Sequence, residues 1–317
     1  MIALVTGCAG FIGSHLTEAL LGRGARVIGL DCFTDYYGRA AKEANLASIR
    51  GRAEFSFIED RIERVDLGTL LDGVTHVFHL AAQAGVRNSW GRDFRTYTVD
   101  NIDATQTLLE AAKGRPLHRF VYASTSSVYG DAAAIPMKED AALHPISPYG
   151  VTKLAAEHLC MLYNTAYGVP AVALRYFTVY GPRQRPDMAF HKFLRAALEG
   201  RPIVVFGDGG QTRDFTFVAD AVAATMAAGD RGTPGAVYNI GGGSRISLSD
   251  ALTIIERVVG RPIPVRREPS QKGDMRDTYA DTSRARADLG FAPSVTLEEG
   301  LAAEHAWLAA SVVDQRS

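Results

Sequence analysis

Short apolar segments alternate with longer amphipathic segments through the first half of the chain, and this alternation most restricts the possible folds. The segments "IALVTG", "RVIGLD", "THVFHLAA", "HRFVYAS" and "AVALRYF" have the length and composition of buried strands. Segments such as "FIGSHLTEALLGRG" and "NIDATQTLLEAAKG" have helical periodicity. Apolar strands that alternate with helices are typical of a parallel sheet covered on both faces. The sequence therefore predicts an α/β fold with a doubly wound parallel sheet.

The pattern loosens from about Arg175 onward, where glycine- and proline-rich loops separate shorter elements. These loops include "YGPRQRPDM", "FGDGGQTRDF" and "GDRGTPG". We expect residues 1–174 to form a Rossmann-type domain, which the chain re-enters later. Residues 175–317 should mainly form a smaller C-terminal α/β lobe, because a chain of 317 residues exceeds one small core.

The glycines of "VTGCAGFIGSHL" predict a dinucleotide site. Gly7, Gly10 and Gly13 follow a strand and open a helix, where backbone nitrogens approach a pyrophosphate and the helix dipole favours negative charge. Asp31 ends the next strand, and a carboxylate there accepts hydrogen bonds from the adenosine ribose. The same carboxylate repels a 2′-phosphate, so the sequence favours NAD over NADP.

Further cofactor contacts are expected at other strand ends and helix starts. Asp60 and Arg61 follow the apolar "FSFIE" and are placed beside the adenine, and "LAAQAGV" ends another strand where its backbone borders the cofactor. The complete set of additional expected cofactor contacts is Phe11, Ile12, Asp60, Arg61, Leu80, Ala81, Ala82, Gln83, Asn101, Ser124, Tyr149, Lys153 and Tyr176.

Tyr149 and Lys153 lie one helical turn apart in "SPYGVTKLAAEH", so they share one face of the predicted helix. A run of hydroxyls, Ser124 to Ser127, ends the strand before this helix, and both features should meet at the carboxyl edge of the sheet. The Lys153 ammonium and a bound nicotinamide should lower the pKa of Tyr149 from about 10. We therefore expect a catalytic group of Tyr149, Lys153, Thr125 and Ser126.

Composition excludes several other classes of protein. A net charge of -1 without a basic block disfavours a nucleic-acid partner, and no apolar run approaches the roughly 20 residues of a membrane span. The three cysteines lack metal-ligand spacing, so no metal site is expected. The first residues resemble a strand rather than a signal peptide, which predicts a cytoplasmic protein.

Taken together, the motifs resemble the nucleotide-sugar epimerases of the extended short-chain dehydrogenase/reductase family. The resemblance extends over nearly the whole chain, through "TGCAGFIGSHL", "LDCFTDYY", "HLAAQAGVR", "STSSVYG", "SPYGVTK", "RYFTVYGPRQRPDM", "FGDGGQTRDF" and "GDMRDTYAD". It implies bound NAD and a UDP-sugar substrate in the second lobe. The positions that match the family's nucleotide-binding motifs are Val204 and Phe206 near the base, and Arg213 and Arg276 at the diphosphate.

The hydroxyl run distinguishes members of the family. Related 4,6-dehydratases carry an Asp-Glu pair in this motif and the decarboxylases a glutamate, whereas this chain reads Thr125-Ser126-Ser127. The resemblance therefore implies epimerisation at carbon 4, through a transient 4-keto sugar that rotates before its hydrogen returns. A two-fold pairing of helices, as in relatives, implies a homodimer.

The sugar is expected to be glucuronate, since the motifs resemble the UDP-glucuronate 4-epimerases. Ser127, Thr178 and Arg185 match the pocket for the sixth carbon, where hydroxyls and a cation suit a carboxylate, and Arg87 is expected to contact the substrate too. The alternatives are UDP-glucose or UDP-N-acetylglucosamine 4-epimerase and UDP-glucuronate decarboxylase. A dehydrogenase that releases its cofactor and a non-catalytic NAD-binding scaffold also stay open.

Overall fold

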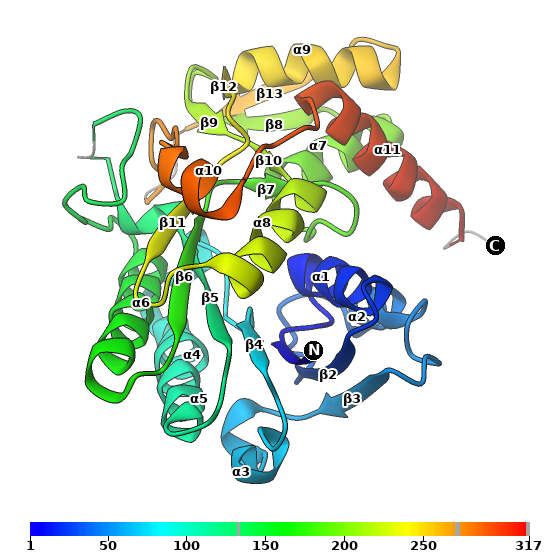
Figure 1. Ribbon diagram of the computed structural model, residues 1–317. Helices are drawn as coiled ribbons and strands as arrows, with labels where there is room; N and C mark the ends of the chain where they lie inside the picture. Colours follow the sequence, from blue (N-terminus) through cyan, green and yellow to red (C-terminus); the bar gives the residue numbers. More distant parts are fainter. Residues whose placement is uncertain (132–133, 270–272, 315–317) are drawn as a thin grey trace.

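A seven-stranded parallel sheet forms the central layer of the computed structural model, which describes residues 1–131, 134–269 and 273–314. The strand order is β11-β6-β5-β4-β1-β2-β3, and every neighbouring pair is parallel. The order runs outward in both directions from β1 and β4, which confirms the predicted doubly wound sheet (Figure 1). Its strands are β1 (Ile2–Thr6), β2 (Arg26–Asp31), β3 (Phe55–Glu59), β4 (His76–His79), β5 (Arg119–Thr125), β6 (Ala171–Tyr176) and β11 (Val237–Ile240).

Helices cover both faces of this sheet because successive strand residues point to opposite sides. In β1, Ala3 and Val5 belong to one core and Leu4 to the other. The first core includes side chains of α1 (Phe11–Gly22), α2 (Arg39–Leu46), α8 (Val218–Arg231) and α10 (Ser283–Leu289). The second includes those of α3 (Leu67–Leu70), α5 (Ala104–Ala112) and α6 (Pro148–Tyr167), with α4 (Phe94–Tyr97) beside α6.

A second lobe lies at one edge of the sheet, at the top of Figure 1. Its strands pair as β7 (Val179–Tyr180) with β10 (Thr216–Phe217), β8 (Ile203–Phe206) with β13 (Val265–Glu268), and β9 (Thr212–Asp214) with β12 (Arg245–Ser247). Around them lie α7 (Ala189–Leu198), α9 (Leu248–Val259) and α11 (Leu297–Asp314). The chain returns to the central sheet through α8 and β11.

Short helical turns complete the chain, namely Ile62–Arg64, Arg87–Ser89, Gly91–Asp93 and Ser126–Val128, with a wider π turn at Thr98–Asp103. None of the helices in the described ranges is both long and apolar enough to cross a bilayer.

A buried ion pair fixes α6 against the sheet. Glu157 of α6 accepts from Arg175 of β6, with Nη2–Oε1 at 2.7 Å and Nε–Oε2 at 3.1 Å, and both side chains are only 3% exposed. Ser124 of β5 donates to the same carboxylate at 2.6 Å, and Arg175 also donates to the Tyr129 hydroxyl at 2.8 Å. One carboxylate therefore joins the helix to two neighbouring strands.

Replacing Glu157 by alanine should strongly destabilise the protein. The substitution leaves the buried Arg175 guanidinium without its counter-charge, which typically costs about 3–5 kcal/mol of unfolding free energy. Urea unfolding should show a large fall in the midpoint. The matched control is Glu43→Ala, which removes an exposed i,i+4 pair with Arg39 and should leave the midpoint unchanged. Equal midpoints for the two variants would contradict a stabilising role for the buried pair.

Candidate active site

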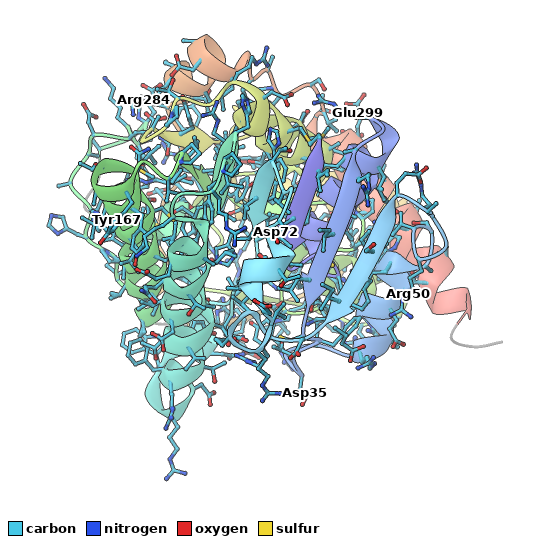
Figure 2. The ribbon with its side chains drawn as sticks, turned by 60° about the horizontal axis from the view of Figure 1, so that its bottom comes forward. Asp35, Arg50, Asp72, Tyr167, Arg284 and Glu299 are labelled. Atoms are coloured by element: carbon cyan, nitrogen blue, oxygen red, sulfur yellow. The ribbon has the colours of Figure 1, made fainter. Side chains whose placement is uncertain are left out.

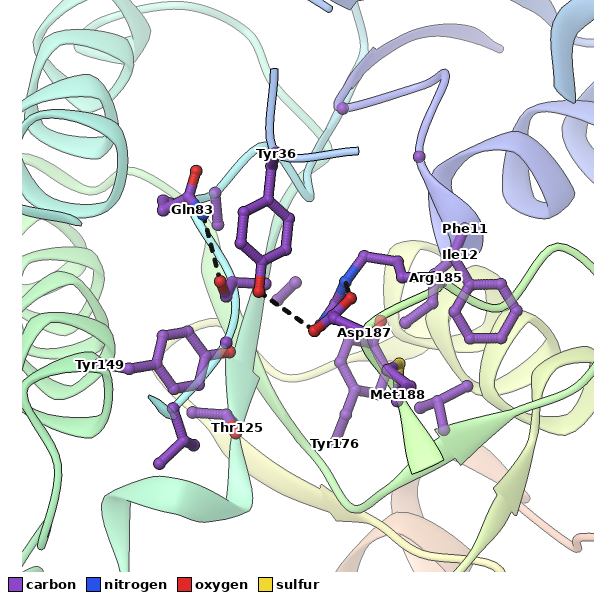
Figure 3. Close-up of a pocket in the computed structure, with 18 of the residues that line it drawn as sticks. Phe11, Ile12, Tyr36, Gln83, Thr125, Tyr149, Tyr176, Arg185, Asp187 and Met188 are labelled. Atoms are coloured by element: carbon purple, nitrogen blue, oxygen red, sulfur yellow. Dashed lines mark hydrogen bonds and ion pairs between the residues drawn. The ribbon is translucent and has the colours of Figure 1, made fainter. Parts of the chain in front are cut away.

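A cavity of about 650 Å³ opens between the carboxyl ends of the central strands and the second lobe. Every residue predicted from the sequence to bind cofactor or substrate, or to catalyse, lines it, except Asn101 and Arg276. The cavity size is typical of small-molecule sites, which lie at this edge of a doubly wound sheet. Figure 3 shows Tyr149, Thr125, Tyr176 and Arg185 facing the same space.

The glycine loop packs too tightly for any other residue at its key positions. Gly7 has φ of 71°, and an added Cβ would meet the Ala81 nitrogen at 2.8 Å. A Cβ on Gly13 would lie 2.1 Å from the Gly7 carbonyl oxygen. These contacts bring the start of α1 against the end of β1, and the first N–H groups of a helix have no intrahelical partner. The N-terminus of α1, at Phe11 and Ile12, therefore faces the cavity as an anion-binding site.

Asp31 lies at the cavity wall at the end of β2, with its carboxylate held by backbone donors. Its oxygens accept from the Ala9 nitrogen at 3.1 Å and the Phe33 nitrogen at 2.9 Å. Lys42 of α2, which lies outside the predicted site, lines the cavity with its nitrogen 3.7 Å from Asp31 Oδ1. No motif marks Lys42, because it reaches Asp31 from a different element.

The segment after β4 borders the cavity with its backbone, as predicted for Leu80 to Gln83. Asn101 holds this segment from behind. Its side chain accepts from the Gln83 nitrogen at 2.7 Å and donates to the Gln83 carbonyl oxygen at 3.1 Å and to Thr152 at 3.0 Å. Asn101 therefore positions the backbone that borders the cavity and lies behind its wall.

Helix α6 begins where it can present Tyr149 to the cavity. Ser147 caps its first turn by accepting from the Gly150 nitrogen at 3.1 Å, and Pro148 occupies the first helical position. A Cβ on Gly150 would lie 2.6 Å from the Ser127 carbonyl oxygen, so this glycine permits α6 to approach the hydroxyl run. Lys153 follows one turn later on the same face, 4.3 Å above the Tyr122 ring.

Burial sets the protonation of this pair. It raises the pKa of Tyr149, against the opposing effects of Arg185 and the Thr125 hydroxyl. Without a bound cofactor the pKa of Tyr149 is thus raised, because removal from water outweighs the nearby donors. The lowering expected beside a bound nicotinamide stays a prediction. Burial also lowers the pKa of Lys153 to about 7, although the nearby Glu157 carboxylate opposes this effect.

The side chains of the hydroxyl run, Ser124 to Ser127, have different partners. The Ser124 side chain is engaged by Glu157, as described above, and all four residues from Ser124 to Ser127 line the cavity at the end of β5. Thr125 Oγ1 lies 3.3 Å from Ser127 Oγ and accepts from the Ser127 nitrogen at 3.2 Å. The run therefore presents two or more hydroxyls beside Tyr149 and no carboxylate of its own.

The second lobe contributes Val204 and Phe206 of β8 and Arg213 of β9 to the far end of the cavity. Arg87 lies with its guanidinium 4.4 Å from the Phe206 ring centre and pairs with Asp274 at 2.7 Å. Arg276 does not line the cavity. Its side chain is 65% exposed, and its carbonyl oxygen accepts from Arg213 at 2.9 Å.

Arg185 lines the cavity as predicted, with partners that the sequence analysis does not identify. Asp187 forms a bidentate ion pair with it, with Nε–Oδ1 at 2.9 Å and Nη2–Oδ2 at 3.0 Å. The Tyr36 hydroxyl donates to Asp187 Oδ2 at 3.1 Å, as the dashed line in Figure 3 marks. Tyr36 belongs to the quoted "LDCFTDYY", but only the fold brings it to this loop.

The residues present fit a dinucleotide cofactor. The glycine cradle has no space for side chains, the start of α1 offers donors, and Asp31 keeps acceptor capacity for ribose hydroxyls. The described residues hold no cluster of His, Cys, Asp or Glu that could bind a metal ion.

Comparison with known proteins shows which family the chain resembles. Residues 3–241 match the NAD dependent epimerase/dehydratase family. A Bacillus subtilis (strain 168) relative, described as the uncharacterized UDP-glucose epimerase YtcB, is 45% identical over 310 residues, which cover 97% of this chain and 98% of the relative. The UDP-glucuronate 4-epimerase of Thermodesulfobacterium geofontis (strain OPF15) is 38% identical over 303 residues, 94% of this chain and 93% of that protein.

A solved structure agrees over the full fold. The UDP-glucuronic acid 4-epimerase from Bacillus cereus, in complex with UDP-glucuronic acid and NAD, has a TM-score of 0.96 and 45% identity, and covers 98% of this chain and 100% of that one. By fold, by glycine loop and tyrosine–lysine pair, and by these similarities, the chain belongs to the NAD dependent epimerase/dehydratase family.

Proposed function

We propose that this protein interconverts a UDP-sugar and its carbon-4 epimer, with UDP-glucuronate and UDP-galacturonate as the pair. One observation carries the proposal: the hydroxyls of Thr125 and Ser127, the Tyr149 phenol and the Arg185 guanidinium line one cavity. The hydroxyl run carries no carboxylate of its own, unlike the corresponding motif of the eliminating and decarboxylating enzymes. The UDP-glucuronate 4-epimerases among the relatives support the same choice of sugar.

Tyr149 is the base in this proposal. It takes the proton from the sugar 4-hydroxyl, and Thr125 hydrogen-bonds the same oxygen. When bound, NAD supplies the oxidising and reducing equivalent at carbon 4. Lys153 would hold the ribose next to the nicotinamide, and hydrogen-bond acceptors beside its nitrogen would favour the charged ammonium. After the sugar turns, Tyr149 returns the proton to the 4-oxygen. Because the hydride removed from carbon 4 would also be given back to that carbon, the overall reaction is redox-neutral.

Rotation of the keto sugar requires an anchored diphosphate. Arg213 and Arg87 lie at the far end of the cavity, where guanidinium groups can bind phosphate oxygens bidentately. Arg276 holds Arg213 through its carbonyl oxygen and contributes from outside the wall. We propose that residues 1–174, completed by α8 and β11, bind NAD, and that residues 175–317 mainly bind the nucleotide sugar.

A 4-keto glucuronate is a β-keto acid, which loses carbon dioxide when the breaking bond aligns with the carbonyl π system. An epimerase must therefore hold the carboxylate out of that alignment. Ser127, Thr178 and Arg185 provide hydroxyls and a guanidinium for this purpose through charge-assisted hydrogen bonds.

Purified protein incubated with UDP-glucuronate should give a product of unchanged mass with inverted configuration at carbon 4, followed by NMR and mass spectrometry. Tyr149→Phe should lower turnover by roughly 10²–10⁴-fold, because the base is lost, and should leave NAD content unchanged. Tyr167→Phe is the matched control, since Tyr167 lies exposed at the end of α6 (Figure 2) and should keep full activity. Near-normal turnover in Tyr149→Phe would exclude Tyr149 as the base.

Arg185→Ala should weaken the hold on the sugar carboxylate. We expect KM for UDP-glucuronate to rise by roughly tenfold or more and the decarboxylated fraction of product to increase. Product ratios from mass spectrometry measure the second effect. Arg195→Ala, which removes an exposed cation paired with Glu199 on α7, should change neither value. If Arg185→Ala behaves like Arg195→Ala, Arg185 does not hold the carboxylate.

A UDP-glucose 4-epimerase is the second candidate, and a specific contact favours it. Asp187 already neutralises Arg185, so a sugar with a hydroxymethyl group meets no unpaired cation at this position. The Bacillus subtilis relative is described as a UDP-glucose epimerase. Turnover of UDP-glucose but not UDP-glucuronate would select this candidate.

We propose that the protein works as a cytoplasmic homodimer. Its three cysteines are free thiols, consistent with a reducing compartment. Helix α6 presents Val151 and Leu162, which are 47% and 57% exposed, on one face, since residues eleven positions apart lie almost in line along a helix. This stripe supplies an apolar surface for a second copy.

Light scattering should give a mass of twice the 34.1 kDa chain for the wild type. Leu162→Asp should give the mass of a single chain, because a carboxylate in an apolar interface is strongly disfavoured. Val265→Asp places the same charge on the exposed β13 and should leave the mass unchanged. A wild-type mass of one chain would exclude the dimer.

A further inference from the structure

Two loops from different lobes meet over the sugar end of the cavity. Tyr36 lies after β2, in the segment that starts at Asp31, and Arg185 and Asp187 lie after β7. The hydroxyl of Tyr36 donates to Asp187 Oδ2 at 3.1 Å, and its ring centre is 5.8 Å from the Arg185 guanidinium. Figure 3 shows the Tyr36 ring between Gln83 and Asp187, opposite Tyr149 and Thr125.

The position of Tyr36 depends on a glycine in a third loop. Gly85 has φ of 103°, and a Cβ added to it would lie 2.2 Å from the Tyr36 hydroxyl oxygen. Tyr97 donates to the Gly85 carbonyl oxygen at 2.7 Å and so fixes this loop. Only a residue without a side chain leaves room for the Tyr36 hydroxyl to reach Asp187.

Asp187 engages two of the five N–H donors of the Arg185 guanidinium. The bidentate pair engages Nε and Nη2, and no hydrogen bond joins Nη1 to any residue in the part of the chain that the structure describes. Burial works against ionisation of Asp187, but Arg185 and Tyr36 outweigh it and hold the pKa of the carboxyl below its usual value. The Asp187 carboxylate is therefore a permanent negative charge beside the guanidinium at neutral pH.

We propose that Asp187, held in place by Tyr36, is a positioning residue that sets the preference of the site between sugars with a carboxylate and sugars with a hydroxymethyl group at carbon 6. It cancels most of the Arg185 charge and leaves one nitrogen to meet the sugar. The guanidinium then still orients a sugar carboxylate. It binds that carboxylate less strongly, so sugars without a charge at carbon 6 can also bind. The inference rests on the proposed function for the identity of the two ligands.

The test measures affinity without turnover. Calorimetry on NAD-loaded protein that carries Tyr149→Phe gives Kd for UDP-glucuronate, UDP-glucose and UDP, with and without Asp187→Asn. Asparagine keeps the shape of the side chain and removes its charge. We expect the Kd of UDP-glucose divided by that of UDP-glucuronate to rise by roughly fivefold or more, because Arg185 then acts with its full charge in a partly buried position. The Kd of UDP, which lacks the sugar, should not change.

Asp35→Asn is the matched control. Asp35 is exposed next to Tyr36, is absent from the cavity wall and projects outward in Figure 2, so its loss should leave the ratio unchanged. A purely structural role for Asp187 predicts equal weakening of all three ligands. That result would overturn the inference, and so would a ratio that changes less than twofold or changes as much in Asp35→Asn.

Separate measurements test the role of Asp187 and the epimerase activity. Wild-type protein that binds both UDP-sugars but does not epimerise UDP-glucuronate refutes the function, while the change in the ratio still supports or refutes the role of Asp187. Wild-type protein that binds neither sugar refutes both.

Discussion

The buried Glu157 carboxylate is the interaction on which the geometry of the site depends. It lies two turns after Tyr149 on α6 and joins that helix to Ser124 of β5 and Arg175 of β6. Because a one-residue shift rotates a helix by about 100°, loss of this register would turn Tyr149 and Lys153 away from the hydroxyl run. By fixing α6 against the sheet, the network places Tyr149 beside Thr125.

Features that depend on a short stretch of sequence are predicted correctly, whereas features that depend on contacts between distant parts of the chain are not. The sheet, the glycine loop and the Tyr149–Lys153 pair are encoded in short periodic patterns, and the structure places each where the pattern predicts. Asn101 and Arg276 match motifs but lie behind the wall, because a motif does not state which way a side chain points. The role of Tyr36 is not predicted from the sequence because its partner, Asp187, lies 151 residues later in the chain. The raised Tyr149 pKa depends on burial, which no local pattern encodes.

Three cations of the cavity lie beside carboxylates of the same chain. Lys42 lies 3.7 Å from Asp31, Arg87 pairs with Asp274 at 2.7 Å, and Arg185 pairs with Asp187 at 2.9 Å. A partly buried cation without a partner would cost stability in the protein before ligand binds. Pairing removes that cost, and an anionic ligand then competes with a resident carboxylate. In the proposed role of Asp187, selectivity depends on how firmly this carboxylate is held, and Tyr36 holds it by a hydrogen bond.

Lys153 differs from these three cations because burial lowers its pKa and no carboxylate pairs with it among the described residues. It lies over the Tyr122 ring, and burial lowers its pKa to about 7, so the ammonium is only partly populated at neutral pH before a ligand arrives. A ligand that accepts hydrogen bonds from the ammonium favours its charged form and raises that pKa again. The charge that favours the Tyr149 phenolate therefore increases when the site is filled. Burial, which raises the pKa of Tyr149 and lowers that of Lys153, disfavours the charged form of both groups in the protein alone and couples their ionisation to binding.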